Sequence, residues 1–443
     1  MNKNEAELRI EQLIAKICSE ELKESARQAG DHASWTRHRK MPLEDILLCI
    51  LRKKGLTTTM ELRQYFQEVN KVEMTVSNQD YFKQRQKLNP DVFLGLNQSY
   101  LRNFYKGEEA ECWNGYLLFA IDGSRAEIPD SEENRKVYGE SINKYGKAVA
   151  RANISVIHDV FNRFILDIRI NNYRSSEIEQ AKEHITALKE IIGDRPVLIM
   201  FDRNYSSLEF IDFLEKSGVN YIIRLHKNDF KAEVSGMKQA DEEVKLAHTN
   251  SRLRHLKQKD PGRAGELKQT KSSSVRIVTV KLANGEFASF VTNLREGTAG
   301  DIQRLYRKRW SIEKKYHTLK NKLKFESVTG KASIYVKQDF FAQVIVFNMV
   351  QDLITRAEKD AAKKKKKKPL KYEMRINENI AIGLFKEQFI RLMIEKDNDL
   401  KSRIFGQLIA DMKRNIVPIR KLKSSPRKWK YFNKYKCNQK PSF

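Results

Sequence analysis

The chain contains the stretch YLLFAIDGS at residues 116–124. It opens with an uninterrupted apolar run, which is typical of a β-strand buried on both faces, and the run ends in Asp122. A second stretch of the same design, PVLIMFD at residues 196–202, ends in Asp202. Two buried strands that each end in a carboxylate predict a sheet with acidic side chains at its strand ends.

The segments around these two strands predict the rest of the sheet. Residues 152–162 and 163–171 are expected to form an antiparallel pair, and the second alternates apolar and polar residues. Capping boxes at Ser176 and Ser206 each open a segment with helical spacing, and VNYIIRL after the second is a further strand. Three antiparallel strands followed by parallel strands with covering helices is the order of a ribonuclease-H-like mixed sheet, so we expect an α/β fold.

Composition along the chain predicts helical regions on both sides of this core. Residues 1–112 contain short helices with a basic surface and are expected to form a helical N-terminal DNA-binding region. Residues 113–330 are the expected ribonuclease-H-like catalytic domain, with a β-rich insertion at about 225–294 that contains the hairpin signal Asn284–Gly285. Residues 331–443 are expected to form a helical, basic C-terminal region.

The charge of the chain is extreme. Its 443 residues include 84 Lys and Arg against 57 Asp and Glu, which gives a formal net charge of +27 and a pI near 9.7. Such a surface repels itself unless a polyanion binds it. Nucleic acid is the first candidate and an anionic membrane surface the second, and the wide spread of basic residues favours nucleic acid. The lysine run within 361–369 and the aromatic, basic tail at 427–436 both suit phosphate contact.

Cysteine usage and hydropathy exclude several classes of protein. The four cysteines lie far apart, no pair has zinc-ligand spacing, and the eight histidines do not complete a zinc site. No apolar run is long enough to span a bilayer, and the amphipathic N-terminus carries acidic residues, unlike a secretory signal. We therefore expect a reduced, cytoplasmic protein with no membrane partner.

The stretch YRKRWSIEKKYHTLK at residues 306–320 has helical spacing. On an ideal helix, a strip about 60° wide holds a group of polar residues, beside an apolar stripe; the third side is expected to face water. The strip holds Tyr306, Arg309, Glu313 and Lys320; the stripe holds Leu305, Ile312, Tyr316, Leu319 and Leu323; the third side holds Arg307, Lys308, Lys314, Lys315, Thr318 and Lys322. A basic surface helix can also align these charges by accident, and the pattern alone leaves both interpretations open.

Asp122, Asp202 and Glu313 together would make an oxygen-rich metal site. Carboxylates without zinc ligands nearby favour Mg²⁺ or Mn²⁺. Two such ions about 4 Å apart can activate a water or a 3′-hydroxyl and stabilise the leaving oxygen of a phosphodiester. We expect Asp122 to bridge both ions and the other two acids to hold one each.

The remaining polar residues of the strip suit contact with DNA. Arg309 and Lys320 can grip phosphates beside the scissile bond, the arginine as a fork and the lysine as a point charge. Tyr306 can hydrogen-bond a phosphate or pack on a displaced base.

These motifs resemble those of the IS4-type insertion-sequence transposases, a family of DDE transposases. The family signature Y-(2)-R-(3)-E-(6)-K is matched by Tyr306, Arg309, Glu313 and Lys320. AIDGS resembles the surroundings of the family's first aspartate and FDRNYSS those of the second, although DRNYS stands where DRGY is commoner. The family also carries a β-rich insertion before its glutamate.

The resemblance implies cut-and-paste DNA transposition with a metal-binding catalytic triad of Asp122, Asp202 and Glu313. It implies, as partners, double-stranded DNA with terminal inverted repeats, target DNA and a second copy of the chain in a homodimeric synaptic complex. It places the protein in the bacterial cytoplasm, at the nucleoid. In relatives the cut 3′-hydroxyl forms a hairpin and a flipped base stacks on an aromatic. Phe287 and Phe290 are candidates for that aromatic, whereas Trp310 is expected to pack.

Two other functions remain compatible with the residues. A ribonuclease-H-fold nuclease would use the same carboxylates without joining strands. A non-catalytic DNA-binding protein, such as a domesticated descendant, would need only the charge, because counterion release supplies most non-specific affinity for DNA. The three intact acids argue against the non-catalytic protein, whereas only the joining of strands to a target separates the transposase from the nuclease.

Overall fold

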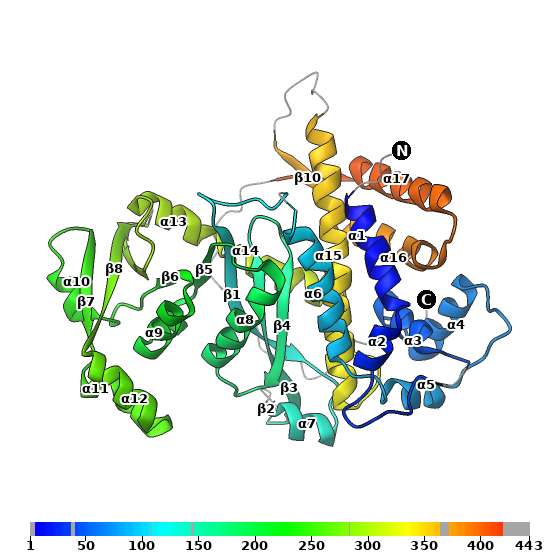
Figure 1. Ribbon diagram of the computed structural model, residues 1–443, viewed down its shortest axis with the longest axis horizontal. Coiled ribbons are helices and arrows are strands. Elements are labelled where there is room, and N and C mark those ends of the chain that lie inside the picture. Colours follow the sequence, from blue (N-terminus) through cyan, green and yellow to red (C-terminus); the bar gives the residue numbers. More distant parts are fainter. Residues whose placement is uncertain are drawn as a thin grey trace.

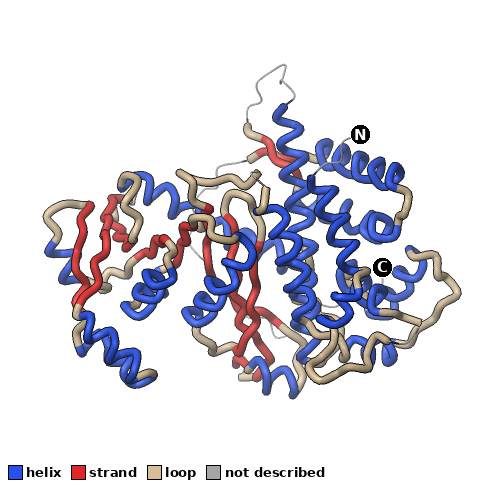
Figure 2. Tube along the Cα trace, viewed as in Figure 1, coloured by secondary structure: helices blue, strands red, loops and turns tan. Residues whose placement is uncertain are grey.

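The computed structural model describes residues 5–36, 40–107, 109–142, 146–282, 284–363 and 372–419. The lysines at 364–368 and the tail at 427–436 lie outside these ranges, so their expected contact with phosphate stays a prediction. The molecule is elongated, with a twisted sheet between a small β-rich end and a large helical end (Figure 1). Figure 2 shows the same division by secondary structure, with strands from the middle to the small end and helices filling the other end.

The central sheet confirms the predicted ribonuclease-H-like order. Strands β1, β3 and β4 are antiparallel neighbours, and β5 and β6 follow as parallel neighbours on the other side of β1. The five strands are β1 (Leu117–Glu127), β3 (Ala148–Asp159), β4 (Ile165–Asn172), β5 (Val197–Phe201) and β6 (Asn220–Arg224). Residues 117–121 of β1 and 197–201 of β5, which make up most of the two apolar runs, are all buried, as strands covered on both faces require. The helices between the strands are α8 (Glu177–Ile192) and α9 (Leu208–Ser217), and α7 (Glu132–Tyr138) and β2 (Glu140–Ile142) precede β3.

The β-rich insertion continues the central sheet. Strand β9 pairs antiparallel with β6, and β8 and β7 follow, so the sheet reaches nine strands among the described residues. The predicted hairpin joins β8 to β9, and Gly285 in its turn has a φ of +85°. The elements of the insertion are α10 (Lys231–Gly236), β7 (Asp241–Ala247), α11 (Asn250–Lys259), α12 (Pro261–Thr270), β8 (Ser272–Lys281) and β9 (Phe287–Thr292).

Helices from both ends of the chain form the helical end of the molecule. The long helix α15 (Ser333–Lys363) runs beside α6 (Asp91–Tyr105) and α1 (Glu5–Ile17), as Figure 1 shows. Buried ion pairs join α15 to N-terminal helices: Asp339 lies 2.7 Å from Arg85, the last residue of α5, and Asp352 lies 2.8 Å from Arg9 of α1. The remaining elements are α2 (Glu20–Ser25), α3 (Leu43–Arg52), α4 (Thr58–Glu68), α5 (Asn78–Arg85), β10 (Met374–Ile376), α16 (Glu378–Ile394), α17 (Asn398–Arg414) and β11 (Ile416–Pro418).

The stretch at 306–320 departs from the single helix that its spacing predicts. It divides between α13 (Ala299–Lys308), α14 (Ser311–His317) and a π-helical turn, η2 (Thr318–Lys322). The predicted apolar stripe is buried. However, Thr318 is buried and Lys315 is largely covered, so the prediction that both face water is wrong. The physical reason is that α15 and α16 pack against this side of the stretch, which its own pattern could not indicate.

Candidate active site

Two neighbouring parallel strands bring Asp122 and Asp202 to the same place. Ala120 of β1 lies opposite Met200 of β5, and each aspartate comes two residues later. Asp202 follows β5 directly and caps the short helix η1 (Arg203–Tyr205), where it accepts a hydrogen bond from the backbone of Arg203. The prediction that Asp122 ends its strand is wrong, because β1 continues to Glu127 through its pairing with β3. Only the pairing with β5 stops before Asp122.

Arg309 lies among the three predicted acids. Its Nη1 donates to Asp122 Oδ2 at 3.1 Å, and its Nη2 lies 3.9 Å from Glu313 Oε1. Burial by itself would lower the pKa of Arg309, but Tyr306 and the charges of Asp122, Asp202 and Glu313 raise it above its usual value. Asp122 and Glu313 thus lie beside one guanidinium, and the charge of Asp202 also acts on it.

The chemistry of these side chains suits a hard divalent cation. All three acids offer carboxylate oxygens, the ligands that Mg²⁺ and Mn²⁺ prefer. Burial raises the pKa of Asp122 to about 6; Arg309 opposes this shift and the nearby charge of Asp202 adds to it. Among the described residues no three His, Cys, Asp or Glu side chains stand close enough together to hold a metal ion. The three acids therefore do not form a closed set of ligands, and Arg309 lies between two of them, Asp122 and Glu313.

The other two predicted residues lie on either side of the acids. Lys320 Nζ donates to Ser124 Oγ at 3.0 Å and to the backbone carbonyl of Arg125, so it lies along β1 just beyond Asp122. The Tyr306 ring packs between Phe290, at 4.9 Å between centroids, and the Arg309 guanidinium, at 5.6 Å. Within the described part of the chain, the buried Tyr306 hydroxyl and Arg309 Nε have no hydrogen-bond partner.

Comparison with known proteins decides the family. Residues 113–349, which are more than half of the chain, match the family model described as the transposase DDE domain. The chain belongs to the DDE transposases. It is 23% identical over 330 residues to the transposase InsG for insertion sequence element IS4 of Escherichia coli (strain K12), an alignment that covers 71% of this chain and 70% of that protein. The predicted IS4-type membership and the predicted function, that of a DNA transposase, are thereby confirmed.

Two further proteins resemble this chain. A putative transposase y4zB of Sinorhizobium fredii (strain NBRC 101917 / NGR234) is 34% identical over 77 residues, which cover 17% of this chain and 22% of that protein. A solved piggyBac transposase synaptic complex with hairpin DNA aligns with 94% of this chain and 84% of its own chain, at a TM-score of 0.43 and 10% identity. Within the described ranges of this transposase, no helix combines the length and apolarity of a membrane span.

Two residues of the site were missed by sequence reasoning. Tyr316 Oη donates to the backbone carbonyl of Asp122 at 2.7 Å and so ties α14 to β1. Glu177, the first residue of α8, packs on Gly123, where an added Cβ would lie 2.8 Å from a Glu177 carboxylate oxygen. Burial raises the pKa of Glu177, and the charge of Asp202 raises it further. The glycine after the first aspartate was the only signal in the sequence that another side chain approaches there.

The aromatic side chains near the site differ in exposure. Trp310 is 64% exposed, so the prediction that it packs is wrong; the break between α13 and α14 turns it outward. Phe287 is 68% exposed, whereas Phe290 is buried against Tyr306. Of these three aromatic residues, Trp310 and Phe287 are exposed enough to meet a base without repacking.

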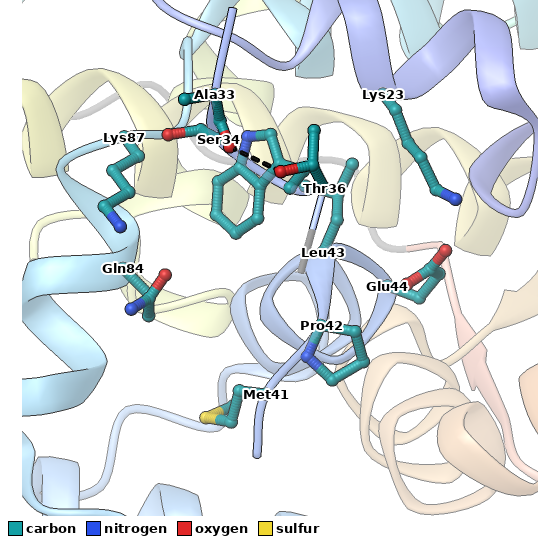
Figure 3. Close-up of a pocket in the computed structure, with 11 residues that line it drawn as sticks. Lys23, Ala33, Ser34, Thr36, Met41, Pro42, Leu43, Glu44, Gln84 and Lys87 are labelled. Carbon is teal, nitrogen blue, oxygen red and sulfur yellow. Dashed lines mark hydrogen bonds between the residues drawn. The ribbon is translucent and has the colours of Figure 1, made fainter. Parts of the chain in front are cut away.

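The pocket in Figure 3 lies in the helical end of the transposase, away from these acids. It has a volume of about 410 Å³ between α2, residues 33–36, α3 and α5. Lys23, Lys87 and Glu44 are among the side chains around it. No lining residue belongs to an element that carries one of the three acids, so the pocket is not the reaction site.

Proposed function

We propose that Asp122, Asp202 and Glu313 are the catalytic triad with which this transposase cuts and rejoins DNA in cut-and-paste transposition. The observation that supports this role most strongly is the equivalent position of the two aspartates on β1 and β5, with Glu313 beside the same arginine. DDE transposase domains use divalent metal ions. We propose two Mg²⁺ or Mn²⁺ ions, held by these carboxylates, which would activate a water or 3′-hydroxyl and stabilise the leaving oxygen.

Residues around the acids would position the DNA. Arg309 has an unpartnered Nε and a planar fork that can bind two phosphate oxygens. Lys320 would place a point charge on the backbone beside β1, where its ammonium group already meets oxygen acceptors. Tyr306 holds the Arg309 guanidinium from the other side, and its unpartnered hydroxyl can donate to a phosphate.

We also propose a role for each of the three regions of the chain. Residues 1–112 would bind DNA, residues 113–330 would carry out the chemistry, and the basic region 331–443 would hold the phosphate backbone. The substrates would be double-stranded DNA with terminal inverted repeats and a target DNA, bound by a homodimer that bridges two ends in the bacterial cytoplasm. The net charge of +27 supports a polyanionic partner.

A plasmid that carries the gene between its own flanking sequences tests this proposal. Incubation with the purified chain, Mg²⁺ and a second, unmarked plasmid should release the element and join it to the second plasmid. Excision without joining would support the nuclease alternative, and binding without any cut would support the non-catalytic one. Either outcome would contradict cut-and-paste transposition.

Replacing Trp310 by alanine is expected to weaken the step that needs a displaced base. Stacking of a base on an aromatic contributes about 1–3 kcal/mol, so second-strand cleavage should slow by about tenfold or more while first-strand nicking stays near the wild-type rate. Phe287→Ala is the comparison variant, because that side chain is similarly exposed and is the other candidate for the stacking residue. A gel that separates nicked from fully cut DNA measures both steps. If Phe287→Ala alone slows the second cut, Phe287 is the stacking residue and the assignment to Trp310 is wrong.

Replacing Glu177 by glutamine is expected to raise the Mg²⁺ concentration needed for half-maximal cleavage. Loss of a group that supports metal ligands typically costs 10- to 100-fold in metal affinity, so we expect a shift of about tenfold. Glu179→Gln is the control, because Glu179 lies on the same helix but pairs with Lys182 and Lys259. Equal metal requirements for both variants would show that Glu177 does not support the metal site.

A further inference from the structure

Glu378, a residue of the C-terminal region, forms hydrogen bonds and ion pairs with residues in and just after the stretch at 306–320. It is the first residue of α16, and its carboxylate is about one-fifth exposed. Its Oε2 accepts hydrogen bonds from Thr318 Oγ1 and Lys322 Nζ, each at 2.7 Å. Its Oε1 accepts one from Gln351 of α15 at 2.7 Å and lies 3.5 Å from Lys315 Nζ. One carboxylate thus connects α14, η2, α15 and α16.

The residues that Glu378 holds in η2 are the two ends of the π-helical turn. Thr318 is its first residue and Lys322 its last, and the Leu323 N–H donates to the Thr318 carbonyl at 3.1 Å, as a π-helical turn requires. Such turns are rare and are frequently found at functional sites, and unfavourable backbone conformations persist where the surrounding contacts fix them. Glu378 supplies a contact of this kind at each end of η2.

The π-helical turn determines where Lys320 lies. Lys320 is its middle residue and reaches Ser124 and Arg125 on β1, immediately after Asp122. An α-helical turn has fewer residues per turn, so replacing the π turn would rotate Lys320 relative to Glu313. Tyr316 of α14 also contacts β1, through a hydrogen bond to the Asp122 carbonyl. The stretch is therefore held to β1 on one side and to Glu378 on the other.

The groups around Glu378 keep its carboxylate ionised. Burial would raise the pKa of Glu378, but Lys315, Lys322 and Thr318 outweigh burial and hold the pKa at about 2. Burial also lowers the pKa of Lys315 to about 8, although Glu378 opposes that shift. Gln351, the fourth group that faces the carboxylate, is neutral. A neutral side chain at 378 would leave two lysines without their shared carboxylate.

We propose that Glu378 is a positioning residue for the transposase reaction, which holds η2 in its π-helical form so that Lys320 and Glu313 face β1 together. This inference rests on the roles proposed above for Glu313 and Lys320. It gives the C-terminal helices a task beyond contact with DNA: they determine the geometry of the site through α16. Glu378 itself touches neither the acids nor, in this role, the DNA.

The test is a double-variant cycle on the full chain, with a labelled duplex that carries the terminal sequence flanking the gene, at saturating DNA and Mg²⁺. Glu378→Gln is expected to lower the cleavage rate by about 10- to 100-fold, because small displacements near reacting groups have effects of that size. Lys320→Ala combined with Glu378→Gln should be no more than about threefold slower than the slower single variant, since both changes disturb the same contact. Glu358→Gln is the matched control: Glu358 is similarly covered, and its carboxylate bonds Arg163 at 2.7 Å and the Ile376 N–H, which lie outside α14 and η2.

The outcomes separate this inference from the proposed function. A Glu378→Gln rate within about twofold of the wild type, or single effects that multiply in the double variant, would overturn the positioning role. If Lys320→Ala and Glu313→Gln both cleave normally, the proposed roles of those residues fail first. Should Glu378→Gln not fold, Thr318→Val removes only one hydrogen bond of the carboxylate and is expected to slow cleavage by several-fold, about 3- to 10-fold. A wild-type rate for Thr318→Val would then count against the inference.

Discussion

Replacing Asp122 by asparagine is expected to lower the rate of DNA cleavage about a thousandfold while DNA binding survives. Asparagine keeps the size of the side chain and can still accept the hydrogen bond from the Gly123 N–H. It removes the negative charge that a divalent cation needs beside Asp202, and metal ions stabilise the transition state by several kcal/mol, about 4 kcal/mol for a thousandfold rate. Single-turnover cleavage of labelled terminal DNA measures the loss, and a gel-shift titration measures binding.

The control for this change is Asp194→Asn. Asp194 is exposed and precedes β5, at the opposite end of the strand from Asp202. Its replacement should leave the cleavage rate within about twofold of the wild type, as for most surface substitutions. If Asp122→Asn nicks DNA as fast as this control does, Asp122 is not part of the catalytic triad.

Replacing Asp339 by alanine is expected to lower the free energy of unfolding by about 3–5 kcal/mol, since the change leaves buried cations without a partner. The Asp339 carboxylate lies 2.7 Å from Arg85 and 3.0 Å from Lys53, and it also accepts a hydrogen bond from the Thr329 N–H. All of these groups are buried, so the pairs hold the N-terminal helices to α15 in a low-dielectric interior.

Denaturant unfolding of the full chain measures this loss. The control is Asp411→Asn, because Asp411 pairs with Arg414 at the surface and such pairs contribute about 0–1 kcal/mol. A decrease of less than about 1 kcal/mol for Asp339→Ala would mean that the helices from the two ends of the chain are held together by other contacts.

The central sheet was predictable because several of its strands have a short sequence pattern that is typical of a β-strand. Apolar runs identified β1 and β5, alternation identified β4, and the capping residue Ser176 identified the start of α8. The start of α9 was predicted one residue early, because Ser207 and not Ser206 caps that helix. The same runs placed Asp122 and Asp202, since parallel neighbours bring equivalent positions together. Helices α11 and α12 were missed because they are mostly polar and expose most of their residues, so they show little periodicity.

The parts of the site that were missed depend on contacts between distant segments. Nothing within residues 306–320 indicates that the helix breaks before Trp310 or widens at Thr318, because the groups that stabilise the second change lie on α15 and α16. Glu177 belongs to a correctly predicted helix, but its approach to Gly123 follows only from how α8 packs against β1. The four signature residues were located by spacing, whereas their orientation was determined by tertiary packing.

The most direct test of the central claim is to ask whether the three acids surround a single metal position. Fe²⁺ with ascorbate in place of the native ion produces radicals that cut the polypeptide close to the bound metal, and the fragments can be mapped by mass spectrometry. We predict cuts near residues 122, 202 and 313 that disappear together in Asp122→Asn. Cuts confined to other segments, or an unchanged pattern in that variant, would contradict a shared metal site.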